Sequence, residues 1–193
     1  MARTKEYDRE NVLAAATELF WKKGFNGTSM KDLVKNTGLN SQSMYKEFKS
    51  KENFFIACLK HYIFEDSKEP ARILSTHPLS LSNIEQFLDN RIEYALSDEC
   101  YGCLLVNTVI EKETLSENIN RIVYSTLDSQ ERLVRECLKA AIKNGEIPSD
   151  KDVDSLTTFI ACFFRGLMNV GKGSADKAKI KTMRNMMMSA ILT

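Results

Sequence analysis

Residues 29–48 read Ser-Met-Lys-Asp-Leu-Val-Lys-Asn-Thr-Gly-Leu-Asn-Ser-Gln-Ser-Met-Tyr-Lys-Glu-Phe, and this stretch decides the fold. Gly38 separates two short amphipathic segments, the first preceded by the capping residue Ser29 and the second by Asn40. Two short helices joined by a glycine-containing turn form the layout of a helix-turn-helix, whose second helix enters the major groove of DNA. The stretch therefore predicts a nucleic-acid-binding motif.

Helical signals continue on both sides of this motif. Asp8 can cap a first helix that ends at Gly24, and Ser50 can cap a fourth helix whose apolar spacing fades between residues 68 and 70. Beyond residue 70 the pattern changes to long amphipathic helices, which we expect after a capping box at Ser82 and Glu85 and over residues 119–141, 152–170 and 175–192. We expect an all-α fold: a three-helix DNA-binding domain over residues 1–66 and a helical bundle over residues 67–193.

Composition narrows the class of protein. Lys and Arg number 27 against 26 Asp and Glu, so the chain is neither a histone-like polycation nor an acidic disordered tail. Residues 1–62 carry 11 basic against 7 acidic side chains, which places the basic excess on the helix-turn-helix unit. Five cysteines without an export signal predict reduced thiols. No apolar run is longer than residues 159–164, which is far shorter than the roughly 20 residues of a membrane span. We expect a soluble cytoplasmic protein.

The predicted second helix carries short polar side chains flanked by cations. Gln42 can form hydrogen bonds to two atoms of one adenine edge, which makes it the candidate for sequence specificity. Serine hydroxyls can bond several different bases and so discriminate weakly between them. Lysines, a tyrosine hydroxyl and the amides at helix starts can hold phosphates and fix the register. The predicted DNA contacts are Thr28, Ser29, Ser41, Gln42, Ser43, Tyr45, Lys46, Lys49 and Lys51. Charge and periodicity alone leave a second interpretation open, in which these are solvated faces of an ordinary helical bundle.

Several short motifs resemble the DNA-binding domain of the TetR/AcrR family of bacterial repressors. They fall at family spacing over about residues 8–60 and are Gly24-Phe25, Thr28-Ser29-Met30, Asp32-Leu33-Val34, Gly38-Leu39-Asn40, Met44-Tyr45, Phe48 and Ser50-Lys51-Glu52. Departures are small: Val34 and Thr37 stand where alanine is commoner. The resemblance implies a homodimeric regulator, usually a repressor, that binds near-palindromic double-stranded operator DNA. It also implies a ligand pocket in the bundle and a dimer interface on the last two helices.

The sequence says less about the effector, the molecule that would release the protein from DNA. Residues 101–108 resemble the segment that opens the sixth helix in a subset of the family, some members of which sense electrophiles through a cysteine at the place of Cys103. A helix start can lower the pKa of a thiol, but a buried cysteine is usually a small hydrophobic group. Aromatic residues that could line a pocket, or simply fill the core, are Tyr62, Phe87, Tyr94, Phe159 and Phe163.

Other motifs predict no enzyme, cofactor or metal site. Cys100-x-x-Cys103 lacks a second pair of ligands at zinc-finger spacing, and residues 166–173 miss the Ser or Thr of a phosphate loop because Gly173 stands there. The histidines, His61 and His77, have no nucleophile at a suggestive spacing. The remaining alternative to a regulator is a helical ligand-binding or enzymatic bundle without DNA binding.

Overall fold

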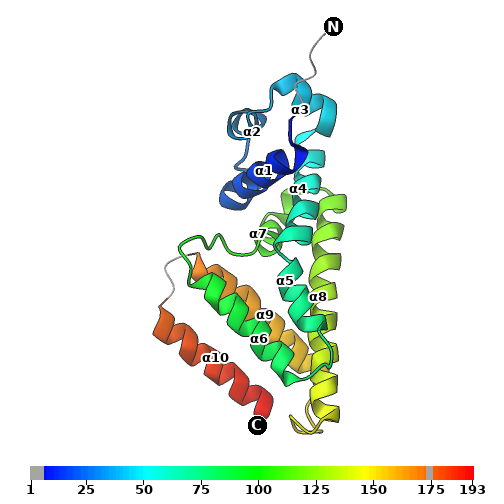
Figure 1. The fold of residues 1–193 in the computed structure, drawn as a ribbon, viewed down its shortest axis with the longest axis vertical. Coiled ribbons are helices and arrows are strands. Elements are labelled where there is room, and N and C mark those ends of the chain that lie inside the picture. The colour runs from blue at the N-terminus through cyan, green and yellow to red at the C-terminus, as the bar shows by residue number, and fades with distance from the viewer. Residues whose placement is uncertain (1–6, 173–175) are drawn as a thin grey trace.

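The computed structural model describes residues 7–172 and 176–193, and within them all regular secondary structure is helical (Figure 1). The predicted all-α class is confirmed. The helices are α1 (Arg9–Lys23), α2 (Met30–Thr37), α3 (Ser41–Phe48), α4 (Lys51–Glu65), α5 (Lys68–Ser75), α6 (Leu81–Ala95), α7 (Leu104–Ile110), a 3₁₀ turn (Lys112–Thr114), α8 (Glu117–Lys143), α9 (Val153–Gly171) and α10 (Lys177–Leu192).

The N-terminal unit consists of α1 to α3 and the first part of α4. The carboxylate of Asp8 accepts the amide of Glu10 at 2.9 Å to begin α1, and Gly24 ends it with a φ of 74°. Phe20 is fully buried and packs against Phe54 and Phe55 of α4. This aromatic cluster fixes α1 across α4 and gives the helix-turn-helix a rigid base.

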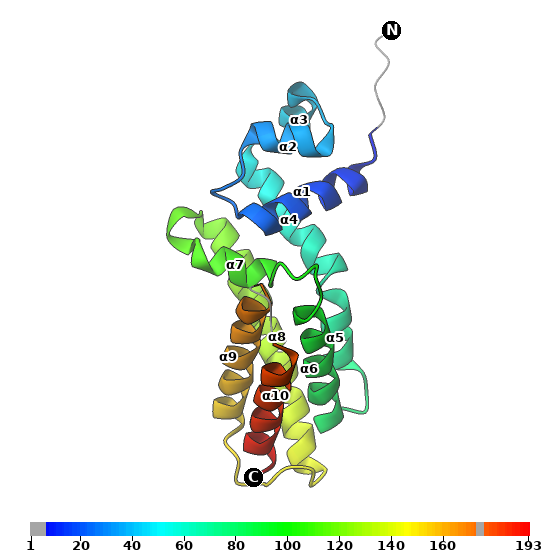
Figure 2. The same cartoon turned by 90° about the vertical axis from the view of Figure 1, so that its left-hand side faces the viewer.

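The C-terminal body is a bundle built around α8. In Figure 1, α4 runs down from the N-terminal unit into this body, and Figure 2 shows α9 and α10 on one side of it. Helices α5, α6 and α9 pack on α8, and α10 packs on α9. The apolar stripe of α8, which includes the fully buried Cys137, Leu138 and Ala141, explains why one side of this 27-residue helix is buried in the bundle.

Two expectations for the middle of the chain are corrected. The fourth helix, expected to fade between residues 68 and 70, ends at Glu65, and a separate helix, α5, begins at Lys68 and tolerates Pro70 in its first turn, where the missing amide costs nothing. The capping box of α6 uses Ser80 and Asn83, not Ser82 and Glu85. The Asn83 side chain accepts the amide of Ser80 at 2.9 Å and donates to the carbonyls of Ile73 and Thr76 at the end of α5. Ser82 cannot serve as this cap because it lies inside α6.

The final helices agree with the expected ranges to within two residues. α9 begins after the cap Asp152 and α10 after the cap Asp176. Ala175, the expected first residue of the last helix, and Gly173 of the near phosphate loop lie outside the described residues. Among the described residues, no helix is both long and apolar enough to cross a membrane.

Candidate nucleic-acid interface and ligand pocket

The second helix of the helix-turn-helix, α3, is fixed by its buried side and by its cap. Gly38 adopts a φ of 67°, a left-handed conformation that ends α2 and turns the chain toward α3. The Asn40 side chain accepts the amide of Ser43 at 2.8 Å. Met44 is fully buried, and Phe48 stacks on Phe54 with ring centroids 3.8 Å apart. These contacts leave the opposite face of α3 free.

That free face carries the residues predicted to read DNA. Gln42 and Tyr45 are exposed, as are the two lysines that follow on the same helix and at its end, Lys46 and Lys49. Ser41 is exposed and Ser43 half-buried. The structure thus brings six of the nine predicted contact residues together on one short helix and its C-terminal end.

The predicted contacts outside α3 are placed differently. Ser29 is exposed, but its hydroxyl and amide both bond the carboxylate of Asp32, so it acts first as the cap of α2. Thr28 is only 1% exposed, and its hydroxyl donates to the Gly24 carbonyl at 2.7 Å. The Thr28 side chain therefore supports the turn between α1 and α2, and the phosphate contact predicted here stays one of the backbone amides at this helix start. Lys51 is half-buried, with its ammonium 4.2 Å from the Phe25 ring centroid.

Acidic side chains near this face are neutralised within the protein. Arg9 Nε lies 3.1 Å from Glu47 Oε1 on α3, and Lys23 Nζ lies 3.5 Å from Asp32 Oδ1 on α2. Lys46 and Lys49 form no ion pair with described residues. The two free ammonium groups beside paired carboxylates give the surface a positive potential suited to phosphates.

The N-terminal unit is tied to the body through the turn after α1. The Glu111 carboxylate, at the end of α7, accepts the amides of Phe25 at 3.0 Å and Asn26 at 2.8 Å. Trp21 Nε1 donates to the Gly102 carbonyl at 3.2 Å. The N-terminal unit is therefore connected to the body by specific bonds from α1 and the turn after it, as well as by the continuous helix α4.

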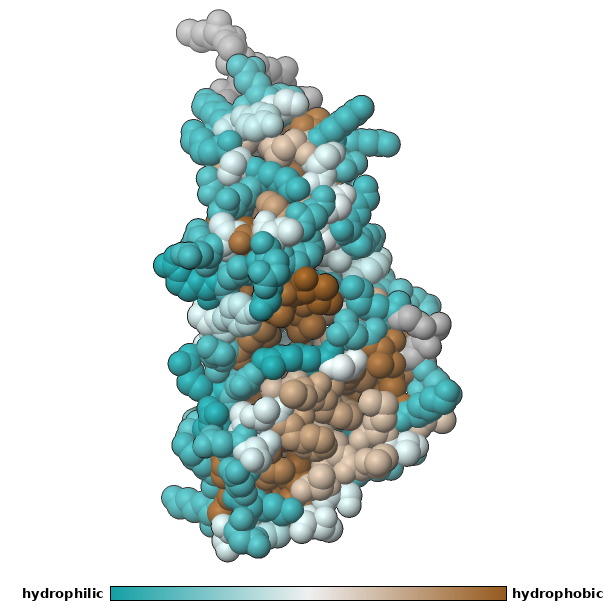
Figure 3. All heavy atoms as spheres, turned by 180° about the vertical axis from the view of Figure 1, so that it is seen from behind, coloured by the Kyte–Doolittle hydropathy of each residue, from teal (hydrophilic) through white to brown (hydrophobic). Residues whose placement is uncertain are grey.

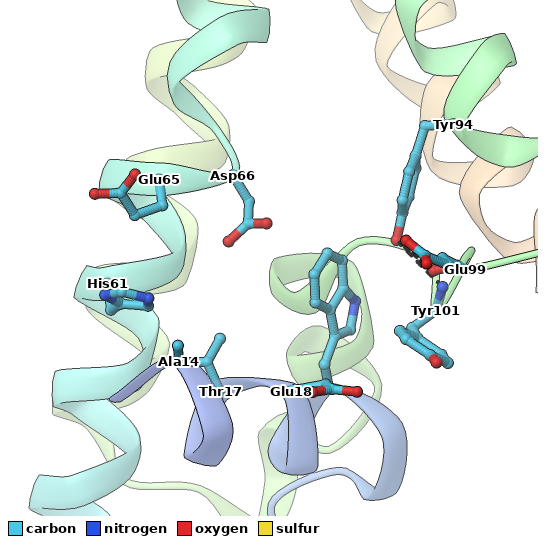
Figure 4. Close-up of a pocket in the computed structure, with 10 residues that line it drawn as sticks. Ala14, Thr17, Glu18, His61, Glu65, Asp66, Tyr94, Glu99 and Tyr101 are labelled. Atoms are coloured by element: carbon cyan, nitrogen blue, oxygen red, sulfur yellow. Dashed lines mark hydrogen bonds between the residues drawn. The ribbon is translucent and has the colours of Figure 1, made fainter. Parts of the chain in front are cut away.

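A cleft of about 540 Å³ lies at this junction. Figure 4 shows His61, Glu65 and Asp66 along α4 on one side, and Tyr94, Glu99 and Tyr101 on the other, above Ala14, Thr17 and Glu18 of α1. Trp21 completes the lining. The volume of the cleft lies within the usual range of small-molecule sites. Burial raises the pKa of the Asp66 carboxyl, since the charged form loses hydration.

Three of the predicted effector residues converge near this cleft. Tyr94 lines it, and its hydroxyl accepts the amide of Tyr101 at 3.2 Å. Behind it, the buried Tyr62 hydroxyl lies 3.5 Å from Cys103 Sγ. Burial raises the pKa of Tyr62 well above its ordinary value. The Cys103 thiol therefore lies in the interior, behind the aromatic wall of the cleft.

The other three effector candidates lie elsewhere. Phe87 is buried against Phe164, with ring centroids 5.5 Å apart, and is a core residue. Phe159 is 42% exposed and Phe163 half-buried on the outer side of α9. Neither Phe159 nor Phe163 lines the cleft, since helical spacing identifies an apolar face without identifying what covers it.

Sequence reasoning missed Trp21, Glu18 and Asp66 as lining residues. Trp21 is the single tryptophan of the chain and lies one position beyond the buried Phe20, on a side of α1 that faces the body. The position of Trp21 next to the apolar stripe of α1 was the sequence feature that could have indicated this role. Among the described residues, no cluster of three His, Cys, Asp or Glu side chains could hold a metal ion.

A helix-turn-helix mounted on a helical body defines a DNA-binding regulator, and comparisons agree. The model of bacterial regulatory proteins of the tetR family matches residues 12–58, and the tetracyclin repressor-like C-terminal domain matches residues 80–187. Because the second match alone covers more than half of the chain, this protein belongs to the TetR family of transcriptional regulators. The predicted family is confirmed, and with it a non-enzymatic class of protein.

Three relatives illustrate the similarity. The transcriptional repressor ComR of Escherichia coli K12 is 29% identical over 92% of this chain and 86% of its own. The repressor NemR of the same strain is 28% identical over 75% of this chain and 72% of its own. A cysteine mutant of the regulator CifR, solved with a 26-base-pair double-stranded operator, superposes with a TM-score of 0.84 at 25% identity, covering 97% of this chain and 99% of that one.

Proposed function

We propose that this protein is a repressor that binds near-palindromic operator DNA as a homodimer and is released by a small molecule. The observation that carries the DNA-binding part is the exposed face of α3, where Gln42 lies among free ammonium groups on a rigid aromatic base. The operator complex of the related CifR supports the same mode of binding. Membership of a regulator family disfavours the alternative of a bundle without DNA binding.

We assign the two steps of recognition to different side chains. Gln42 reads a base edge, with Ser41 and Ser43 beside it, while Lys46, Lys49 and Tyr45 hold phosphates. Ser29 and Lys51 lie at the starts of α2 and α4, where the hydroxyl of Ser29 and the ammonium of Lys51 contribute contacts to phosphates. In this division of the chain, residues 1–66 form the DNA-binding domain and residues 67–193 the ligand-binding and dimerisation domain.

The dimer interface in this proposal is the outer face of α9 and α10. Large apolar side chains are exposed there: Phe159 at 42%, Met186 at 68%, and also Val170, Met183 and Leu192. Figure 3 shows apolar residues gathered on the lower half of the face where these helices lie. Monomeric proteins rarely leave such a patch in water, and a two-fold axis through it would place two reading helices at half-sites about 34 to 36 Å apart.

The effector acts, in this proposal, at the junction of the two domains. An occupant that favours one orientation of the N-terminal unit shifts the spacing of the two reading helices and weakens DNA binding by the same coupling energy. A reactive electrophile that modifies Cys103 is the second form of effector, favoured by the contact between that thiol and Tyr62 behind the cleft. Five free cysteines suit a reducing cytoplasm, which is the location we propose.

Selection of duplexes from a random DNA pool by the purified protein tests the proposal. We expect enrichment of an inverted repeat whose half-sites lie one helical turn apart, and a complex of two chains per duplex. Recovery of duplexes without a common sequence, or binding of equal strength to random DNA, would contradict it.

A further inference from the structure

The cleft at the domain junction has two chemically different walls. One is aromatic and contains Trp21, Tyr94 and Tyr101. Trp21 and Tyr94 stack with ring centroids 6.1 Å apart, and Tyr101 approaches Trp21 edge-on at the same distance. The rings brace one another, so this wall is already ordered before any ligand arrives.

Carboxylates surround this aromatic wall. Four of them line the cleft, and three, Glu65, Asp66 and Glu99, form no ion pair with described residues. The fourth, Glu18, pairs with Lys22. In Figure 4, Asp66 and Glu99 come from opposite sides, α4 and the segment after α6. The cleft therefore keeps an excess of negative charge in a partly desolvated space.

The aromatic rings already attract cations from the protein itself. Lys22 Nζ lies 4.8 Å from the Tyr101 ring centroid, and the Arg91 guanidinium carbon lies 5.7 Å from that of Tyr94. Such contacts are typical of the attraction between a positive charge and the face of an aromatic ring. Lys22 and Arg91 thus supply two positive charges next to four carboxylates, so the net charge around the cleft is negative.

We propose that this cleft binds an organic cation with a flat or bulky apolar body. The aromatic wall would receive the apolar body, and the carboxylates would compensate its charge. The three unpaired carboxylates are exposed around the cleft, so they attract a cation but add nothing to the binding of a neutral ligand, and an inorganic cation would not fill about 540 Å³. Quaternary ammonium and pyridinium compounds have the required combination of charge and apolar surface.

Only the effect of a bound cation on operator binding rests on the proposed function. Because Ala14, Thr17 and Glu18 belong to the N-terminal unit while Tyr94 and Tyr101 belong to the body, an occupant touches both domains. The cation would then favour one angle between them and weaken operator binding. Binding of the cation itself is measured without DNA.

The first measurement is calorimetric titration of the full chain with 1-methyl-4-phenylpyridinium and, separately, with 4-phenylpyridine. At mildly alkaline pH the second compound is neutral and has nearly the same shape, so the pair isolates the effect of charge. We expect saturable binding of the cation, at least about tenfold tighter than the neutral compound. Equal affinities, or no binding of the cation, would overturn the proposal.

A pair of double variants locates the site. Asp66→Asn with Glu99→Gln removes two carboxylates from opposite sides of the cleft with little change in shape, and we expect it to weaken cation binding about tenfold or more. Glu117→Gln with Asp128→Asn makes the same change of charge on exposed positions of α8 that do not line the cleft. Equal losses in both variants would show attraction by net charge only and would overturn the proposal.

Two controls separate this inference from the proposed function. Circular dichroism of the variants establishes that each is folded, and Trp21→Leu supplies an independent removal of the aromatic wall, which should also abolish the preference for the cation. Operator binding is then measured with no cation present. Specific operator binding without any cation binding would overturn the inference alone, whereas cation binding without operator binding would overturn the proposed function alone.

Discussion

Glu111 Oε2 accepts the backbone amide of Asn26 at 2.8 Å, across 85 positions of the chain. Its second oxygen accepts the amide of Phe25, so one carboxylate satisfies both donors of the turn that leads into the helix-turn-helix. Charge-assisted bonds of this kind are stronger than neutral ones, and an amide left without its partner in a partly buried place is costly. The orientation of the DNA-binding domain therefore depends on a residue of the body.

Replacing this carboxylate should destabilise the protein measurably. For Glu111→Ala we expect a loss of about 1 to 3 kcal/mol in the free energy of unfolding, measured by urea denaturation. Glu113→Ala is the matched control, since Glu113 lies in the 3₁₀ turn and pairs only with Lys112 on the surface. Its loss should stay below about 0.5 kcal/mol. Equal losses would mean that Glu111 is no more than a surface charge.

Gln42 should determine sequence preference at one base position. Gln42→Ala is expected to cost about 1 to 3 kcal/mol at that position and nothing on random DNA, because it removes a bidentate contact to a base. Fluorescence anisotropy with operator duplexes that differ at single positions measures this. Lys46→Gln serves as the comparison and should weaken specific and random duplexes alike. A uniform loss for Gln42→Ala would contradict its role as the reader.

Salt dependence should report the phosphate contacts. With about three to four cations per subunit on phosphates, the dimer should lose affinity with a slope of log affinity against log salt of about −5 to −7. Lys46→Gln should reduce the magnitude of this slope by about two, since each of the two subunits loses one contact. A flat dependence would favour a bundle that does not bind DNA.

Charges on the outer face of α9 and α10 should separate the subunits. We expect Phe159→Glu combined with Met186→Asp to give a monomer in light scattering, since both apolar side chains would be buried by the partner. Phe64→Glu is the control, because Phe64 is 67% exposed, as much as Met186, but lies on α4. A dimer that survives the first change and dissociates with the second would place the interface on the other face.

The five thiols should differ in reactivity. Cys162 is exposed, whereas burial raises the pKa of Cys58 to about 12 and that of Cys137 to about 11, so few of those thiols ionise. Cys162 lies three positions beyond Phe159, on the face of α9 that the proposed dimer buries, so a brief maleimide treatment followed by mass spectrometry should label it faster in the Phe159→Glu, Met186→Asp monomer than in the dimer. Cys58 should be labelled last in both. Cys103 is the informative case. Loss of operator binding that accompanies its labelling, and that is absent in Cys103→Ser, would support the electrophile form of release; unchanged affinity would exclude it.

Local features of the sequence were sufficient for the N-terminal unit. The capping residues Asp8, Ser29, Asn40 and Ser50 and the glycines at 24 and 38 mark where each helix begins and ends, and the structure places the helices there. These signals act between residues a few positions apart, so they can be read without knowing the fold. The exposed face of α3 follows from the same spacing.

The ligand cleft could not be deduced in this way. Its walls come from residues 14–21, 61–66 and 94–101, which meet only when α1 and the body close on α4. Helical periodicity predicts that Trp21, Phe159 and Phe163 lie near an apolar face, but it carries no information on which element covers that face. Thr28 shows the same division: the sequence places it at a helix start, and only packing shows that its side chain is buried.

The sequence by itself determined the helices and caps of the N-terminal unit and the family, because these rest on short-range backbone bonding and on motifs within one segment. Tertiary structure alone decided which aromatic residues face a cleft, which thiols are accessible, and that Glu111 supports the turn at Asn26. Those properties depend on contacts between distant segments, whose partners are chosen by the packing of the whole chain.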